Sequence, residues 1–224
     1  MSKHIVKVLK ADFVTHNVKR FVVEKPAGFS FTPGQACDVS INRPGLEKEL
    51  RPFTFTSVPD SDTLEFIIKI YSGHDGVTNK LGTVGRGDEL ILHDVFGTIA
   101  YRGDGLYIAG GAGITPFIAI LRDLELKNNL SGNTLIFVNR TANDVILEYE
   151  LKELLGDKFV SVVEASGDPS IPPKFIDRDF LRPYVGDQHK FYYICGPEAF
   201  TSVVIGYLSD LGIDPSQIVI EEPW

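Results

Sequence analysis

The sequence predicts a β plus α/β protein, with an N-terminal antiparallel β-barrel domain over residues 1–102 and a parallel-sheet α/β domain over residues 103–224. Short runs of β-branched and aromatic residues, separated by Pro, Gly and Asp turns, indicate the barrel in the first half. In the second half apolar runs alternate with helical patterns, which is typical of a parallel sheet covered on both faces. The charge changes too: residues 1–102 hold 13 basic and 12 acidic residues, whereas residues 103–224 hold 9 and 18.

Six segments of the first half have the length and composition of strands. They are residues 5–9, 19–24, 36–41, 54–56, 64–70 and 89–92. Turn residues such as Pro26-Ala-Gly28 and Pro33-Gly34 separate them. One short helix is expected at Val77–Leu81, directly after Gly76.

The second half contains five apolar runs of strand length, at residues 106–109, 134–138, 159–163, 191–195 and 218–220. Helical patterns lie between them, at residues 116–126, 149–155, 178–181 and 199–211. This alternation of strand and helix implies a parallel sheet covered on both faces.

Composition excludes several classes of protein. The chain has 224 residues, of which 43% are hydrophobic, and no apolar run approaches the roughly 20 residues that span a bilayer. The first residues carry no secretory pattern, so a cytoplasmic location is expected. A net charge of −8 without a basic patch argues against nucleic-acid binding. The two cysteines, Cys37 and Cys195, predict free thiols and no metal site, because a four-thiolate iron–sulfur cluster cannot be built from two.

A glycine-rich turn lies between a predicted strand and a predicted helix, at Gly110-Gly-Ala-Gly-Ile-Thr-Pro116. Small residues there let backbone N–H groups approach a phosphate, and a helix N-terminus adds positive potential. Pro116 suits the first turn of the helix. The spacing differs from G-x-G-x-x-G, and such a turn on its own is often only structural.

Three further segments contain candidate ligand-binding residues. Arg51-Pro-Phe-Thr-Phe-Thr-Ser57 offers a guanidinium for a phosphate, an aromatic face and a hydroxyl, although it also fits an edge strand with a surface arginine and core phenylalanines. Cys195-Gly-Pro-Glu198 follows an apolar strand, where ligands gather in parallel sheets. The sequence ends in Glu221-Glu-Pro-Trp224, whose tryptophan either frays or covers a flat ring.

Together and in this order, these segments resemble the ferredoxin–NADP reductase superfamily, the FAD-dependent two-domain flavoreductases of the ferredoxin and flavodoxin reductase type. The resemblance extends from Phe31 to Trp224. It implies that residues 1–102 bind FAD and that residues 103–224 bind NAD(P).

The resemblance also implies which residues contact FAD. Arg51 would hold the flavin phosphate, Phe53 would pack on the isoalloxazine and Thr54 would hydrogen-bond near its N5. Phe53 and Thr54 depart from the family's R-x-Y-[ST] motif by losing a phenol and by exchanging Ser for Thr. The full set implied for FAD is Arg51, Pro52, Phe53, Thr54, Ile68, Lys69, Gly76, Val77, Thr78, Thr115 and Trp224.

The nicotinamide nucleotide would lie against the glycine-rich turn and the segment that begins at Cys195. The residues implied are Gly111, Ala112, Gly113, Thr115, Pro116, Arg140, Thr141, Cys195, Gly196, Pro197 and Glu198. Thr54, Cys195 and Glu222 would line the hydride path as weak polar groups, and Trp224 would cap the flavin until nicotinamide displaces it.

The choice between NADPH and NADH stays open from the sequence. Arg140 and Thr141 follow the second strand of the nucleotide domain, where a 2′-phosphate is bound, and they favour NADPH slightly. Glu164 ends the next strand, and a carboxylate that binds the ribose diol would favour NADH.

The function implied is hydride transfer from NAD(P)H to FAD, with electrons passed on to a separate acceptor such as ferredoxin or flavodoxin. Two alternatives remain: a reductase that uses free flavin as substrate, and a non-catalytic flavin-binding electron-transfer subunit. The sequence does not identify the acceptor, the direction of electron flow or the oligomeric state.

Overall fold

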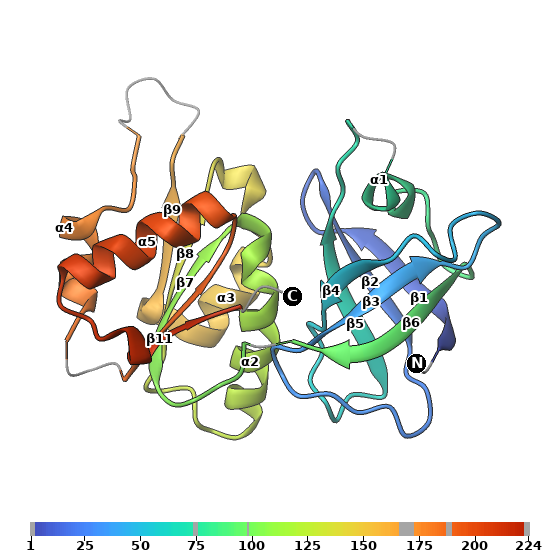
Figure 1. Cartoon of the computed structure of the whole chain (residues 1–224), viewed down its shortest axis with the longest axis horizontal. Helices are drawn as coiled ribbons and strands as arrows, with labels where there is room; N and C mark the ends of the chain where they lie inside the picture. The colour runs from blue at the N-terminus through green and yellow to red at the C-terminus, as the bar shows by residue number, and fades with distance from the viewer. Residues whose placement is uncertain (1–2, 74–75, 98, 166–172, 187–189, 222–224) are drawn as a thin grey trace. The chain divides into compact units, whose positions relative to one another are not determined.

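The structure is a computed structural model, and it describes residues 3–73, 76–97, 99–165, 173–186 and 190–221. The chain divides into two compact units. The first unit contains residues 1–100 together with 115–123, and the second contains residues 101–114 and 124–224. Each unit has its own sheet and its own apolar core (Figure 1).

The first unit is an antiparallel, nearly closed barrel, as the sequence predicts. Its strands are β1 (His4–Phe13), β2 (Val18–Glu24), β3 (Ala36–Ile41), β4 (Arg51–Thr54), β5 (Thr63–Lys69) and β6 (Glu89–Phe96), in the order β4-β3-β6-β1-β2-β5. The two ends of this order meet just beyond β4. There Phe55 bridges to Phe66, and the Thr56 N–H donates to the carbonyl of Glu65 at 2.8 Å.

Aromatic rings fill the barrel where it closes. Phe55 and Phe66 are fully buried, with ring centroids 5.1 Å apart, and Phe31 stacks on Phe55 at 4.3 Å. Burial of a side chain of this size contributes about 2–3 kcal/mol. These rings therefore hold the segment after β4 against β5.

The five-residue helix α1 (Val77–Leu81) is fixed at both ends of its apolar face by Val77 and Leu81, which belong to the barrel core. The residues after it are held by Lys19 of β2, whose ammonium donates to the carbonyls of Gly82 at 2.9 Å and Val84 at 2.8 Å. Lys19 is only 6% exposed, and burial lowers the pKa of its ammonium. The position of α1 thus depends on a buried lysine as well as on apolar packing.

The second unit contains a parallel five-stranded sheet, again as predicted. Its strands are β7 (Gly105–Gly110), β8 (Thr134–Asn139), β9 (Phe159–Val163), β10 (Phe191–Cys195) and β11 (Ile218–Ile220), in the order β11-β10-β7-β8-β9. All four pairings are parallel, so the carboxyl ends of the strands share one edge.

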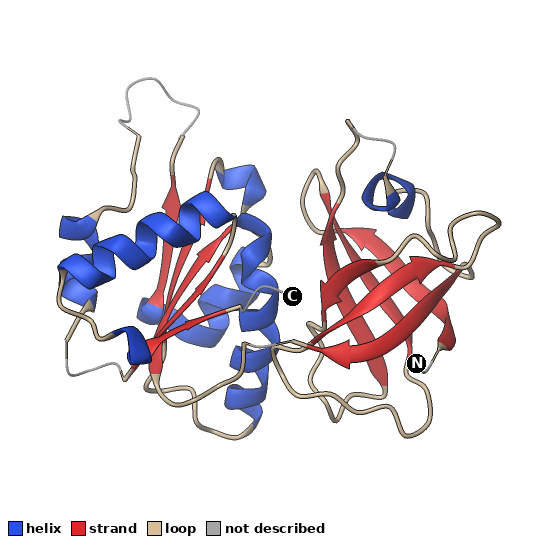
Figure 2. Cartoon of the chain, in the orientation of Figure 1, coloured by secondary structure: helices blue, strands red, loops and turns tan. Residues whose placement is uncertain are grey.

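The α-helices among the described residues that follow β7 are α2 (Thr115–Leu126), α3 (Glu148–Leu155), α4 (Arg178–Leu181) and α5 (Glu198–Asp210). Figure 2 shows α5 on one face of the parallel sheet and α3 on the other. Val204 and Leu208 of α5 pack with Ile108 and Ile194 of the sheet in one buried cluster. Among the described residues, no helix is both long enough and apolar enough to cross a membrane.

Several element boundaries differ from the sequence expectation; for example, β1 runs to Phe13 and β6 to Phe96, and two of the differences involve site residues. The expected strand 54–56 instead runs over Arg51–Thr54, because β4 is the last strand in its sheet and pairs only with β3, where Pro52 is tolerated. The helix expected from Pro116 begins at Thr115 and is preceded by a 3₁₀ turn, η1 (Gly111–Ile114).

The loop between α1 and β6 is held by the carboxylate of Asp88. Its Oδ2 accepts from the Gly85 N–H at 2.8 Å and from the Arg43 guanidinium at 2.8 Å. Arg43 also donates to the hydroxyl of Thr83 at 3.0 Å. The Gly85 N–H, followed by Arg43, lowers the pKa of Asp88 below its usual range.

We expect Asp88→Asn to lower the free energy of unfolding at pH 7 by about 1 kcal/mol, a figure reduced for partial exposure. Because the pKa is depressed in the folded state, this contribution is present above the unfolded pKa of about 3.9 and is lost as the pH falls through the folded value. Urea unfolding of both proteins between pH 7 and pH 3 measures it. The exposed Asp60→Asn is the control, and equal stability of Asp88→Asn and wild type at pH 7 would contradict the assignment.

Candidate functional site

Strand β4 carries the arginine and the first aromatic ring of the Arg51–Ser57 segment. Arg51 is exposed, and its guanidinium donates to the carbonyl of Leu50 at 2.6 Å. Phe53 is half-buried and packs on the barrel core, and Thr54 is half-buried beside it. Pro52 is exposed between them. The strand therefore offers a charged group and part of an aromatic face that the barrel core supports from behind.

The other residues expected to contact FAD in the first unit lie at the end of β5 and the start of α1. Ile68 is buried, whereas Lys69 is half-buried with its ammonium 5.8 Å from the ring centre of Tyr71. Gly76 precedes α1 in an extended conformation (φ −111°), and a Cβ atom built on it would meet nothing within 4 Å. Val77 is a core residue, and Thr78 is half-buried.

The glycine-rich turn joins β7 to α2 through η1. Gly111 adopts φ +52°, and a Cβ atom built there would meet open space. Gly113 differs, because a Cβ atom on it would lie 2.3 Å from the carbonyl oxygen of Cys195 and 2.6 Å from the nitrogen of Gly196. The turn can lie against the end of β10 only if residue 113 lacks a side chain.

Cys195 and Gly196 are thus brought beside the glycine-rich turn. Gly196 packs against the ring of Phe200, which also contacts Gly110. Pro197 precedes α5, and Glu198 lies in its first turn. Burial, and then the nearby carboxylate of Glu221, raise the pKa of the Cys195 thiol to about 12, so this sulfur is neutral at physiological pH.

The carboxyl end of β8 carries Arg140 and Thr141. Arg140 is exposed. The Thr141 hydroxyl donates to the carboxylate of Asp144 at 2.6 Å, and the Thr141 N–H donates to the same carboxylate at 3.0 Å. The loop therefore presents a carboxylate as well as an arginine.

Sequence reasoning missed Asn139, the last residue of β8. Its side chain is 3% exposed, and within the described part of the chain neither its amide nitrogen nor its amide oxygen has a hydrogen-bond partner. Buried amides are nearly always paired, so this side chain is a candidate ligand group. No pattern in the sequence distinguishes it from an ordinary strand end.

Two expected site residues, Glu222 and Trp224, lie outside the described residues. Their assigned roles at the hydride path and over the flavin remain predictions.

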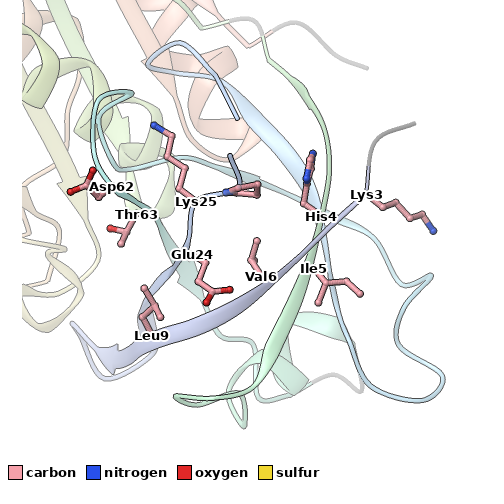
Figure 3. A pocket seen from close by; sticks show the side chains of 10 residues that line it. Lys3, His4, Ile5, Val6, Leu9, Glu24, Lys25, Asp62 and Thr63 are labelled. Carbon is pink, nitrogen blue, oxygen red and sulfur yellow. The ribbon is translucent and has the colours of Figure 1, made fainter. Parts of the chain in front are cut away.

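One pocket lies away from all the predicted site residues, in the first unit between the start of β1 and the end of β2 (Figure 3). It has a volume of about 570 Å³ and is lined by both acidic and basic side chains, including Glu24, Lys25 and Asp62. It arises because β1 pairs with β6 through residues 4–7 but with β2 only from Val8 onward. The Lys7 N–H instead donates to the Glu24 carboxylate.

Comparisons with known proteins agree with this geometry. A family model described as an FAD-binding domain matches residues 3–86, and one described as an oxidoreductase NAD-binding domain matches residues 107–205. A solved ferredoxin NADP⁺ reductase from Neisseria gonorrhoeae, with bound FAD and NADP, has a TM-score of 0.83 at 20% identity and covers 98% of each chain. The chain belongs to the ferredoxin–NADP reductase superfamily.

Two curated relatives are longer than this member of the ferredoxin–NADP reductase superfamily. The reductase component of propane 2-monooxygenase from Mycolicibacterium goodii is 29% identical over 210 residues, which cover 87% of this chain and 59% of the relative. The glycine betaine monooxygenase reductase subunit from Chromohalobacter salexigens is 28% identical, over 96% of this chain and 62% of the relative. The chain therefore spans about three fifths of the length of these relatives.

The residues present fit the two groups that the superfamily's domains bind. The open space at Gly76 and Gly111 leaves room for close approach to backbone N–H groups, which suits phosphates. The exposed Arg51 and the supported ring of Phe53 suit a phosphorylated aromatic ligand. The Asn139 amide, which has no hydrogen-bond partner among the described residues, suits a polar ligand at the carboxyl edge of the parallel sheet.

We expect Gly113→Ala to destabilise the second unit by about 2–3 kcal/mol, because the added Cβ meets the backbone of Cys195 rather than a flexible side chain. Gly206→Ala is the matched control, since Gly206 lies on α5 with nothing within 4 Å of an added Cβ. That control should be neutral or stabilising by up to about 1 kcal/mol. Urea unfolding measures both, and a Gly113→Ala protein as stable as wild type would refute the close approach.

Proposed function

We propose that this chain is an FAD-dependent NAD(P)H oxidoreductase that accepts hydride from a reduced nicotinamide nucleotide and passes electrons to a separate redox protein. The strongest support is that each of the two family models matches the part of the chain that holds the corresponding motif residues. The FAD-binding match includes β4 and the start of α1, and the NAD-binding match includes the glycine-rich turn and Cys195.

In this proposal the first unit holds FAD. The guanidinium of Arg51 pairs with its phosphate, because a planar fork of donors suits a phosphate better than a point charge. The half-buried ring of Phe53 packs on the isoalloxazine, and the Thr54 hydroxyl hydrogen-bonds beside it. Ile68, Lys69 and the backbone of Gly76–Thr78 line the pyrophosphate.

The nicotinamide nucleotide lies along the carboxyl edge of the parallel sheet. Backbone N–H groups of Gly111–Gly113 face its pyrophosphate, and Thr115 and Pro116 begin the helix beneath it. Gly196, Pro197 and Glu198 flank it on the side of β10. The Asn139 amide, buried without a partner among the described residues, is available to the nucleotide or to a water that bridges to it.

When bound, FAD supplies a ring that takes up two electrons as hydride and releases them singly. The protein's contribution is orientation and the exclusion of water. Thr54 and Cys195 suit this role because both are uncharged, and the raised pKa of Cys195 keeps its thiol protonated. Glu222 completes the proposed set of catalytic residues.

We propose NADH as the preferred nucleotide. Arg140 and Thr141 favour NADPH slightly on the sequence alone, whereas the contacts of this loop support NADH. The hydroxyl of Thr141 is already engaged by the Asp144 carboxylate, and a carboxylate in this loop repels a 2′-phosphate. Glu164, half-buried at the end of β9, is a second carboxylate suited to a ribose diol.

The proposed electron acceptor is a ferredoxin or a flavodoxin. The sequence holds two cysteines, Cys37 and Cys195, which cannot supply the four thiolates of a cluster. Both curated relatives described above are reductase components of oxygenase systems, which supports delivery of electrons to a separate protein.

The first experiment tests the flavin. The purified chain should bind one FAD, and NADH should bleach it under anaerobic conditions. Arg51→Ala should weaken FAD affinity by about 10-fold or more through loss of a charged hydrogen bond, whereas the exposed Arg86→Ala should not. A chain that takes up no FAD, or whose FAD is reduced by neither nucleotide, would overturn the proposal.

The second experiment tests nucleotide preference. Steady-state kcat/KM with ferricyanide as acceptor should be at least about 10-fold higher for NADH than for NADPH, equal to a difference of about 1.4 kcal/mol. Asp144→Asn keeps the side-chain acceptor for Thr141 but removes the charge, so it should raise kcat/KM for NADPH and leave that for NADH within threefold. The control is Asp157→Asn, and a wild-type preference for NADPH would refute the assignment.

A further inference from the structure

Helix α2 is apolar on every side for most of its length and then carries one half-buried arginine. Phe117, Ile118, Ala119, Ile120 and Leu121 are each no more than 1% exposed. The side chain of the next residue, Arg122, is 21% exposed. Arg122 lies within residues 115–123, the part of α2 that belongs to the first unit. The buried part of the helix before Arg122 has no polar stripe to set its rotation, so the contacts of this arginine are informative.

Arg122 contacts the segment at which the barrel closes. Its Nη1 donates to the Glu65 Oε1 at 2.7 Å and to the carbonyl of Thr56 at 2.8 Å. The Thr56 hydroxyl donates to the same Glu65 oxygen at 2.8 Å, and Thr56 is fully buried. Glu65 is 14% exposed at its side chain, and its backbone N–H donates to the Ser57 hydroxyl at 3.1 Å. All these residues lie in the first unit.

The two ends of this network are both close in the chain to proposed cofactor residues. Thr56 follows Thr54, the last residue of β4, by two positions. Arg122 follows Thr115, the first residue of α2, by seven positions. Seven residues are nearly two helical turns, or about 10 Å along the axis, so Arg122 and Thr115 lie on almost the same face of the helix.

Apolar contacts and ion pairs constrain a helix differently. Apolar packing tolerates small rotations and shifts of register, because it is not directional. A shielded arginine–carboxylate pair, in which the carboxylate also accepts a buried hydroxyl, requires one geometry and is costly to leave unpaired. The pair therefore defines the rotation and axial position of α2 relative to β5.

We propose that Arg122, held by Glu65 and Thr56, is a positioning residue for hydride transfer. It fixes the helix that starts at Thr115 against the strands that carry the flavin residues. The inference rests on the proposed function, because it assigns Thr115 to the nicotinamide site and β4 to the flavin site. Hydride transfer is sensitive to this geometry, since a displacement of about 1 Å can cost about 100-fold in rate.

The test uses Arg122→Lys and Glu65→Gln, with Glu125→Gln on the exposed end of α2 as the matched control. Arg122→Lys keeps the charge but loses the planar fork, and Glu65→Gln keeps the shape but loses the charge. Stopped-flow reduction by NADH gives the limiting rate of flavin reduction and the Kd for NADH separately. Reoxidation of dithionite-reduced flavin by ferricyanide reports on the flavin site without the nicotinamide.

Each variant should reduce the limiting rate of flavin reduction about 10-fold to 100-fold. FAD content, the Kd for NADH, the flavin midpoint potential and the ferricyanide rate should stay close to wild type. The double variant Arg122→Lys with Glu65→Gln should be no slower than the slower single variant, because both changes act on one contact. Glu125→Gln should match wild type in every measurement.

Limiting rates within twofold of wild type in both single variants would overturn the positioning role. Parallel losses in FAD content and in the ferricyanide rate would also overturn it, because they indicate a purely structural contact. A wild-type protein that binds no FAD, or whose FAD is not reduced by NADH or NADPH, would instead refute the proposed function. The wild-type measurement thus separates the two failures.

Discussion

The backbone connection that follows β4 is the constraint on which the first unit depends. The Phe55 N–H donates to the carbonyl of Gln35, and the next N–H, that of Thr56, donates to the carbonyl of Glu65. Within two residues the chain therefore passes from one side of the barrel opening to the other. This closure aligns the end of β4, buries Phe55, and brings together the carbonyl and the carboxylate that receive Arg122.

In the second unit the corresponding constraint is the absence of a side chain at Gly113. The glycine-rich turn and the end of β10 approach so closely that even one carbon would meet the carbonyl of Cys195. Parallel strands bring their carboxyl ends to one edge of the sheet. Two loops can approach this closely at that edge only because residue 113 has no side chain. The result is a surface built of backbone groups and small side chains, with a neutral thiol among them.

The acidic charge of residues 103–224 is consistent with a nucleotide site of this kind. With 9 basic and 18 acidic residues, this part of the chain has few cations to offer a pyrophosphate. Backbone N–H groups at a glycine-rich turn supply positive potential without them. Asp144 beside Thr141 is one of these acidic residues, and the proposed preference for NADH rests on it.

The sequence by itself determined the two kinds of sheet, the positions of the glycine-rich turn and of Cys195 at strand ends, and the family. These features depend on neighbours two to four residues apart and on Gly and Pro, whose effects are local. Only the tertiary structure decided whether β4 begins at Arg51 or at Thr54, because the edge position that tolerates Pro52 is set by pairing with β3. The isolation of the Asn139 amide, the ion pair between Glu65 and Arg122, and the contact of Gly113 with Cys195 were equally unreadable from the sequence. Each joins residues far apart in the chain or depends on what surrounds a buried group, and such contacts exist only once the strands and helices have packed.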